Sequence, residues 1–258
     1  MVAAQGIGID DAVPDTIFEA SGDDEIVDSP AHVPIPGAHA VGPPGIAVCG
    51  VRIEVPEGIN EACVQQLRLA DAIGARCCVN ISGAFGPKWD FCYRENYTQE
   101  AYEKNVAFIR SLLDTVKPRR TCYALESMQW MLPSSPEETL KIIQDIGSPH
   151  FKAHVDICNM VNDPYKFTHT DELIDRCFAL LGDQIVSCHL KDITMDEGST
   201  VHITEVLPGQ GQMDLRRYLQ RIAELADKDT PVLIEHLPDK ASYEKALKHV
   251  RSIGSEWL

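Results

Sequence analysis

The sequence lacks any apolar run long enough to span a membrane, and its first residues lack the basic and apolar pattern of a signal peptide. Positive charge is also scarce, because 23 lysine and arginine residues stand against 39 aspartate and glutamate residues, a formal net charge of −16. Proteins that bind phosphate backbones usually present a basic face, so this balance disfavours nucleic-acid binding as a main activity. We therefore expect neither a membrane nor a nucleic acid as a partner of this chain.

The nine cysteines include no Cys-x-x-Cys pair, and their number is odd. Several lie inside apolar, strand-like runs, where a reduced thiol behaves as a small hydrophobic side chain. This pattern argues against a disulfide framework and leads us to expect a cytoplasmic protein. A catalytic thiol is the minor alternative.

From about residue 46, short apolar runs alternate with amphipathic segments. Strands are predicted at 46–53, 76–81, 121–125, 151–155, 185–190 and 231–234, and helices at 60–73, 100–116, 136–146, 171–181, 214–226 and 242–253. Strict alternation of apolar strands with helices indicates a parallel sheet covered by helices, in the α/β class. No glycine-rich turn follows the first strand, which disfavours a dinucleotide-binding sheet.

A (β/α)8 TIM barrel needs two more strand–helix units than these six, or roughly 60–80 further residues. The first 45 residues are too few and too irregular for that, since they contain six prolines and little periodic pattern. We expect residues 1–45 to be an irregular segment, a remnant of the first barrel units, and residues 46–258 to be the barrel domain. Either the barrel is incomplete or modified at its N-terminal side, or part of its natural start is missing from this sequence; both alternatives stay open.

Four predicted strands end in a polar residue able to bind a metal ion: Glu126, Asp156, His189 and Glu235. Side chains two apart on a strand point to the same face, so His189 and Lys191 both face the barrel interior. The C-terminal ends of barrel strands converge on one rim, where active sites form. The set therefore predicts three carboxylates and one imidazole in one small volume, although any one of them taken alone could be a solvated loop residue.

Three crowded carboxylates repel one another, and a divalent cation removes that penalty. Mostly oxygen ligands with a single histidine suit Mn²⁺, Mg²⁺ or Co²⁺, with Zn²⁺ as a further alternative. The nearby candidates for a second metal position are limited to Asp192, His202 and His236. We therefore expect one divalent ion, with Mn²⁺ as the first choice.

Several segments are typical of one family: HVDICN at 154–159, CHLKD at 188–192, PGQGQMDL at 208–215 and LIEHL at 233–237. With these segments in this order, residues 46–258 resemble the xylose-isomerase-like TIM barrels, a superfamily of sugar isomerases, ketose 3-epimerases, inosose dehydratases and metal-dependent abasic-site endonucleases. In the epimerases Glu, Asp, His and Glu from successive late strands hold the metal, which implies that role for the four residues named above. The resemblance also implies that Glu126 and Glu235 move a proton on and off the carbon beside a carbonyl, through an enediolate.

Residues near these strand ends are expected to bind the substrate or support the site. Lys191 either stabilises developing negative charge or pairs with Asp192 or Asp156. His154 lies two residues before Asp156 and faces the same way, as a hydrogen-bonded neighbour of the ligands more often than as a ligand. Many epimerases have a histidine where this chain has Asn159, which orients a hydroxyl but carries protons poorly.

Two tryptophans are expected to shape a sugar pocket. Trp89 lies in the segment GPKWD and Trp130 in ESMQWM. Sugars often stack on indole rings, while their hydroxyl groups need partners such as Gln129 and Asn159. The alternative is that both tryptophans pack under long loops.

The first functional hypothesis is a divalent-metal-dependent sugar isomerase or epimerase. The second is a lyase that uses the same base for β-elimination from an oxo-sugar, inositol-type or 3-oxo-glycoside substrate, and the third is a non-catalytic sugar-binding subunit. A small sugar or polyol is the expected partner in each case. The resemblance also implies a homo-oligomer, in which a second chain would cover the strand edges of an incomplete barrel.

Overall fold

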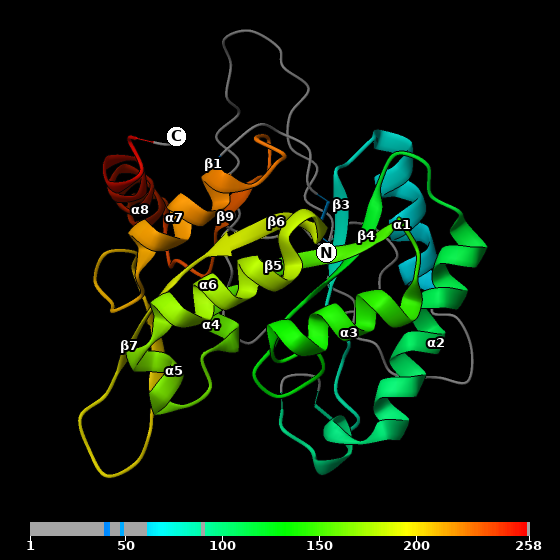
Figure 1. Cartoon of the computed structure of the whole chain (residues 1–258), viewed down its shortest axis with the longest axis horizontal. Coiled ribbons are helices and arrows are strands. Elements are labelled where there is room, and N and C mark those ends of the chain that lie inside the picture. The colour runs from blue at the N-terminus through cyan, green and yellow to red at the C-terminus, as the bar shows by residue number, and fades with distance from the viewer. Residues whose placement is uncertain (1–38, 42–46, 49–60, 89–90, 257–258) are drawn as a thin grey trace, which may run out of the picture.

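The computed structural model describes residues 39–41, 47–48, 61–88 and 91–256, and it contains one large sheet with helices packed against it (Figure 1). The strands lie in the order β1-β9-β6-β5-β4-β3-β2, and every neighbouring pair is parallel except β1 with β9. Their bounds are β1 His39–Val41, β2 Ala47–Val48, β3 Cys77–Asn80, β4 Cys122–Glu126, β5 Phe151–Asp156, β6 Ile185–Leu190 and β9 Val232–Ile234. An antiparallel hairpin of β7 (Asp192–Met195) and β8 (Ile203–Val206) follows β6.

Helices connect the parallel strands. Their bounds are α1 Glu61–Ile73, α2 Gln99–Val116, α3 Pro136–Ile146, α4 Ile157–Met160, α5 Pro164–Thr168, α6 Thr170–Leu181, α7 Leu215–Glu224 and α8 Lys240–Ile253, with short 3-10 helices η1 Arg94–Tyr97 and η2 Gly182–Gln184. Within the described residues, none of these helices has the length and apolar character needed to cross a bilayer.

The six predicted strands correspond to β2, β3, β4, β5, β6 and β9, and the six predicted helices to α1, α2, α3, α6, α7 and α8. The α/β class with a parallel sheet is therefore confirmed. Most of segment 1–45 and of the predicted strand 46–53 lies outside the described residues, so the domain boundary at residue 45 stays a prediction. The antiparallel strand β1, the hairpin and the short helices α4 and α5 have no counterpart in the prediction.

Helix starts follow the chemistry of their first residues. Ser135 Oγ accepts the backbone N–H of Glu138, and Pro136 opens α3. Asp163 and Pro164 begin α5 in the same way. The short helix α5 is therefore encoded by a local signal that the prediction omits.

Strand alternation divides the buried apolar side chains into two clusters. The larger cluster lies between the sheet and its helices and includes Tyr123, Leu125 and Ile234. The smaller cluster lies on the other face of the sheet and comprises Cys77, Val79, Cys122, Ala124 and Leu233. Because side chains two apart share a face, this inner face continues into Glu126 and Glu235 at the ends of β4 and β9.

Seven of the eight cysteines in the described part of the chain are buried, and no disulfide joins any two of these eight. Burial raises the pKa of Cys77 to about 11 and that of Cys188 to about 12, so both thiols stay protonated at neutral pH. A catalytic role for these two thiols is therefore disfavoured. The cytoplasmic location stays a prediction.

Candidate metal centre

The four residues predicted as metal ligands lie together at the C-terminal ends of neighbouring strands. Glu126 ends β4, Asp156 ends β5, His189 lies near the end of β6 and Glu235 follows β9. One ligand atom from each lies within 4.8 Å of the others. His189 Nδ1 is 2.8 Å from Glu235 Oε1, 3.1 Å from Glu126 Oε1 and 3.5 Å from Asp156 Oδ2. The spatial clustering is as expected, while the role of each residue as a ligand stays a prediction.

The four side chains differ in their access to solvent. The Asp156 and His189 side chains are only 1% and 3% exposed, whereas Glu126 and Glu235 are each 13% exposed. In the sheet β9 and β4 are separated by β6 and β5, so the two glutamates approach His189 from opposite sides. A small molecule above the strand ends would therefore meet the glutamates first.

Lys191 is buried within the same group. Its Nζ lies 2.8 Å from Asp156 Oδ2 and 2.6 Å from Glu235 Oε1, and 3.5 Å from Glu205 Oε1 on β8. Of the partners predicted for Lys191, the structure therefore supports Asp156, and it adds Glu235. A cation held between two carboxylates offsets part of the repulsion among the three acids.

The Asp192 carboxylate is hydrogen-bonded to backbone N–H groups and is not an ion-pair partner of Lys191. It accepts N–H groups from Ile193, Gly209, Gly211 and Met213. A Cβ on Gly211 would overlap this carboxylate and the carbonyl oxygen of Ile193, which explains why the PGQG segment has glycine there. The predicted pairing of Lys191 with Asp192 is therefore not found, and Asp192 serves to fix the loop before α7.

Asn159 stabilises two of the candidate ligands. Its side-chain amide donates to Glu126 Oε1 at 2.9 Å, and its backbone N–H donates to Asp156 Oδ1 at 3.0 Å, where Asp156 caps α4. Gln129 Nε2 donates in turn to Asn159 Oδ1 at 3.2 Å. Asn159 is 3% exposed. Its contacts with Glu126 and Asp156 show that it orients carboxylates, in addition to the substrate-binding role predicted from the sequence.

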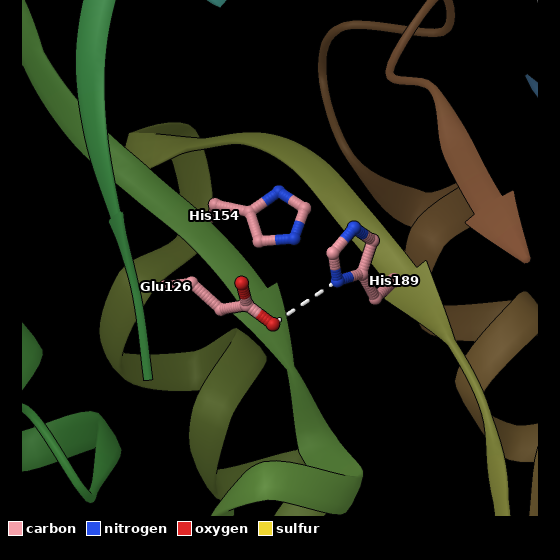
Figure 2. Close-up of side chains that lie close together, drawn as sticks. All are labelled: Glu126, His154 and His189. Atoms are coloured by element: carbon pink, nitrogen blue, oxygen red, sulfur yellow. Dashed lines mark hydrogen bonds and ion pairs between the residues drawn. The ribbon is translucent and has the colours of Figure 1, made fainter. Parts of the chain in front are cut away.

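His154 lies next to His189 and Glu126 at the same centre. It is fully buried, and its ring meets that of His189 edge-on with centroids 4.1 Å apart. Figure 2 shows the His154 and His189 rings and the Glu126 carboxylate turned toward one another. His154 Nδ1 is 2.6 Å from Ser187 Oγ, so the hydrogen-bonded neighbour expected from the sequence is found. Ser187 itself is a residue that sequence reasoning missed, although it lies two residues before His189 on the same strand face.

The surroundings of Glu126 and Glu235 shift the pKa values of these two carboxyl groups in opposite directions. Burial raises the pKa of Glu126, an effect that His189 only partly offsets. Burial also opposes ionisation of Glu235 and Asp156, but the charges of His189 and Lys191 outweigh it and lower the pKa of both carboxyl groups. Burial alone would lower the pKa of His189 and of Lys191, but the neighbouring carboxylates outweigh this effect and raise both pKa values. Glu235 is thus held ionised while Glu126 protonates more easily.

A cavity of about 300 Å³ is connected to this centre through two of its lining residues, since Glu205 lies 3.5 Å from Lys191 and Gln129 donates to Asn159. Its polar lining comes from Gln129, Asn162 and Glu205, and the rest is contributed by Trp130, Cys158, Val161, Ile193, Val201 and Ile203. Gln129 and Trp130 thus line this cavity, while their substrate-binding role stays a prediction, and Trp89 lies outside the described residues. Glu205 was not foreseen because it belongs to the hairpin, which carries no strong strand pattern in the sequence.

The candidates for a second metal position are not assembled into one. His202 is exposed, and Asp192 is fully engaged with backbone N–H groups. His236 Nδ1 pairs with Glu205 Oε2 at 3.0 Å, and its Nε2 lies 3.7 Å from Glu235. Among the described residues, the groups able to hold a metal all contain Glu126 and His189.

The donor set fits a divalent metal ion. It combines three carboxylates with one imidazole, and Asp156 Oδ2 is buried without a well-aligned hydrogen bond from the described residues. Oxygen-rich sets of this kind suit Mn²⁺ and Mg²⁺, and the imidazole also admits Co²⁺ and Zn²⁺. Glu126, Asp156, His189 and Glu235 are therefore the residues that would hold the ion.

Comparison with known proteins identifies the fold family. The model of the xylose isomerase-like TIM barrel family matches residues 33–253. The chain belongs to this family. No curated protein matches the sequence.

Solved structures of this fold are distant in sequence. The xylose isomerase domain protein of Planctomyces limnophilus is 18% identical, with a TM-score of 0.57 over 76% of this chain and 64% of that one. A xylose isomerase-like TIM barrel protein from Mycobacterium smegmatis in complex with magnesium is 16% identical, with a TM-score of 0.58 over 75% and 67%. An L-ribulose 3-epimerase is 16% identical, with a TM-score of 0.56 over 77% and 66%. The chain thus spans about two thirds of the length of these family structures.

Structures with other chemistries share the fold. A probable 3-DHS dehydratase from Bacillus anthracis has a TM-score of 0.56 at 14% identity, over 81% of this chain and 76% of that one. Endonuclease IV from Thermus thermophilus has a TM-score of 0.59 at 16% identity, over 82% and 76%. At such identities the likeness establishes the fold alone, and function has to be argued from the site.

Proposed function

We propose that this chain is a divalent-metal-dependent isomerase or epimerase of a sugar or related polyol. The observation that carries the proposal is the division of the metal centre into two buried and two accessible members. Asp156 and His189 are buried and would serve as ligands only, whereas Glu126 and Glu235 reach the surface of the centre from opposite sides. Two carboxylates on opposite sides of a substrate carbon are what proton removal and return on different faces require.

The protein groups then have distinct tasks. Glu235, kept ionised by Lys191 and His189, accepts the proton from the carbon beside the substrate carbonyl. Glu126, held by the Asn159 amide, returns a proton to the opposite face. When bound, a divalent ion supplies Lewis-acid stabilisation of the negative charge that develops next to that carbon. Mn²⁺ is our first choice for this ion because three of the four predicted ligands are carboxylates.

The test is a ketose panel with the Mn²⁺-loaded protein, with products separated by chromatography. Wild type is expected to form an epimer or an aldose, and Glu126→Gln and Glu235→Gln to lower kcat by about 10²- to 10⁴-fold, because each removes a positioned proton carrier. Glu244→Gln, on the exposed surface of α8, is the matched control and should leave kcat unchanged. Full activity in either site variant, or turnover that survives complete metal removal, would contradict the proposal.

A lyase is the second candidate, because the cavity next to the centre also has room for an aglycone. Its lining combines the Trp130 indole and aliphatic side chains with the polar groups of Gln129, Asn162 and Glu205, so the aglycone and the hydroxyl groups of a 3-oxo-glycoside would both find partners there. The same removal of a proton beside a carbonyl would then be followed by departure of the group on the next carbon. Release of an aglycone or of water from 3-oxo substrates, with no epimer from any ketose, would favour this reading.

A further inference from the structure

His154 has a ring nitrogen that makes no hydrogen bond to any of the described residues. The residue is fully buried, and its Nε2 has no hydrogen-bond partner among the described residues. A buried polar atom without a partner is costly, so such an atom calls for an explanation. Its ring faces Glu126 and His189 (Figure 2), and one ligand atom from each of these three residues lies within 4.8 Å of the others.

Ser187 orients this ring. Ser187 Oγ lies 2.6 Å from His154 Nδ1 and 3.5 Å from Cys77 Sγ. With the proton on Nδ1, the ring donates to Ser187, whose own hydroxyl proton is then free to reach the thiol. Nε2 is left with its lone pair, the arrangement by which metal-binding histidines are usually held.

Lys191 pairs with the two carboxylates that this arrangement does not involve. Its Nζ lies 2.8 Å from Asp156 and 2.6 Å from Glu235, while among the described residues the ion pair of Glu126 is with His189. An ion bound by Glu126, His154 and His189 would therefore leave Asp156 and Glu235 still paired with Lys191.

We propose that His154 is a metal ligand, which together with Glu126 and His189 forms a second, nitrogen-rich metal position overlapping the carboxylate-rich one. Two imidazoles and one carboxylate with an open fourth place form a donor set that Zn²⁺ favours in catalytic sites, whereas Mn²⁺ and Mg²⁺ favour oxygen. The centre then binds Zn²⁺ through His154 and Mn²⁺ without it. This inference rests on the metal centre of the proposed function.

The test compares metal affinities in competition. Wild type, His154→Gln and Ser187→Ala are dialysed against mixtures of Zn²⁺ and Mn²⁺, and the bound metals are measured by elemental analysis. We expect His154→Gln to lose at least ~10-fold in Zn²⁺ affinity, and Ser187→Ala to lose about 10-fold because the ring is no longer fixed, with Mn²⁺ affinity unchanged in both. His150→Gln, just before β5 at the far end of the strand, is the matched control and should behave as wild type.

A second readout follows the coordination of the metal directly. Co²⁺ bound at the nitrogen-rich position should give the strong visible absorption of a low-coordinate ion, and that band should weaken in His154→Gln. Circular dichroism establishes that each variant is folded, and Ser187→Ala keeps the test informative if His154→Gln is not. Equal Zn²⁺ affinity and an unchanged Co²⁺ spectrum in folded variants would overturn the inference alone. Failure of wild type to bind any divalent ion would instead overturn the proposed function.

Discussion

Lys191 is a single positive charge enclosed by acids, and its burial makes it structural as well as functional. Its side chain is 2% exposed and contacts both Asp156 and Glu235. Removing one partner of a buried ion pair leaves the other charge buried without compensation. The resulting loss of stability is larger than the net stabilisation that the intact pair provides. The stability of the metal-free protein therefore depends on this residue.

We predict that Lys191→Met destabilises the metal-free protein by roughly 3–5 kcal/mol, because two buried carboxylates lose their counter-charge. Added Mn²⁺ should recover part of that loss, since a bound cation replaces the missing charge. Urea unfolding with EDTA and with Mn²⁺ measures both values. Lys245→Met, at an exposed position of α8, is the control, and an equal effect of the two substitutions would contradict the prediction.

Individual site residues were predictable where their position along a strand determines the direction in which the side chain points. Glu126, Asp156, His189 and Glu235 each end or nearly end a predicted strand, so convergence at one rim follows from the parallel sheet. The same alternation rule would have found Ser187. The hydrogen bond from Asn159 to Glu126 was harder to predict, because it depends on the short helix α4, which turns Asn159 back over the strand end.

At the scale of elements, Asp71 joins helix α1 to the strand that bears Glu126. Its Oδ1 accepts the backbone N–H groups of Arg119, Arg120 and Thr121, just before β4. Partial burial opposes ionisation of this carboxyl, but these hydrogen bonds and the charge of Arg120 outweigh it and lower its pKa. The start of β4 is therefore anchored by an ionised side chain.

We predict that Asp71→Asn lowers the unfolding free energy at pH 7 by about 1–2 kcal/mol, after allowance for partial exposure. Because the folded pKa lies below the unfolded value of about 3.9, the contribution of Asp71 is present above that pH and fades as the pH falls through the folded pKa. The stability difference between wild type and variant should therefore shrink below about pH 4. Urea unfolding across pH 3–7 checks this, and a difference that is constant with pH would refute it.

The elements that escaped prediction lack a periodic sequence signal. Strand β1 has three residues and pairs antiparallel with β9, and three residues are too few to show a periodic pattern. The strands of the β7–β8 hairpin are separated by the mostly polar stretch DEGSTVH at 196–202, which is typical of a loop. Long amphipathic helices were predictable because their apolar faces repeat over several turns.

At the scale of the whole molecule, the net charge of −16 governs which partners can approach. We predict that a short DNA duplex with an abasic site shows neither binding nor cleavage at physiological salt, although the fold is shared with an endonuclease. Fluorescence anisotropy at several ionic strengths measures binding, and gel electrophoresis measures cleavage. Binding that strengthens as the salt is lowered would reveal a basic surface and contradict the prediction.

The two edge strands of the sheet are relevant to whether copies of this chain associate. Within the described residues, β2 pairs only with β3 and β1 only with β9, so the sheet has two ends. Open edges are commonly covered by another element or another chain. The homo-oligomer expected from the sequence stays a prediction, which light scattering on the purified protein would test.

Asp156 divides its two oxygens between folding and chemistry. Oδ1 accepts the N–H that begins α4, while Oδ2 lies beside Lys191 and His189. The hydrogen bond that starts the helix also stops the carboxylate from rotating, so its rotational entropy is lost when the chain folds and not when an ion or substrate arrives. Such a side chain is preorganised, and tight binding at this centre then costs little further order.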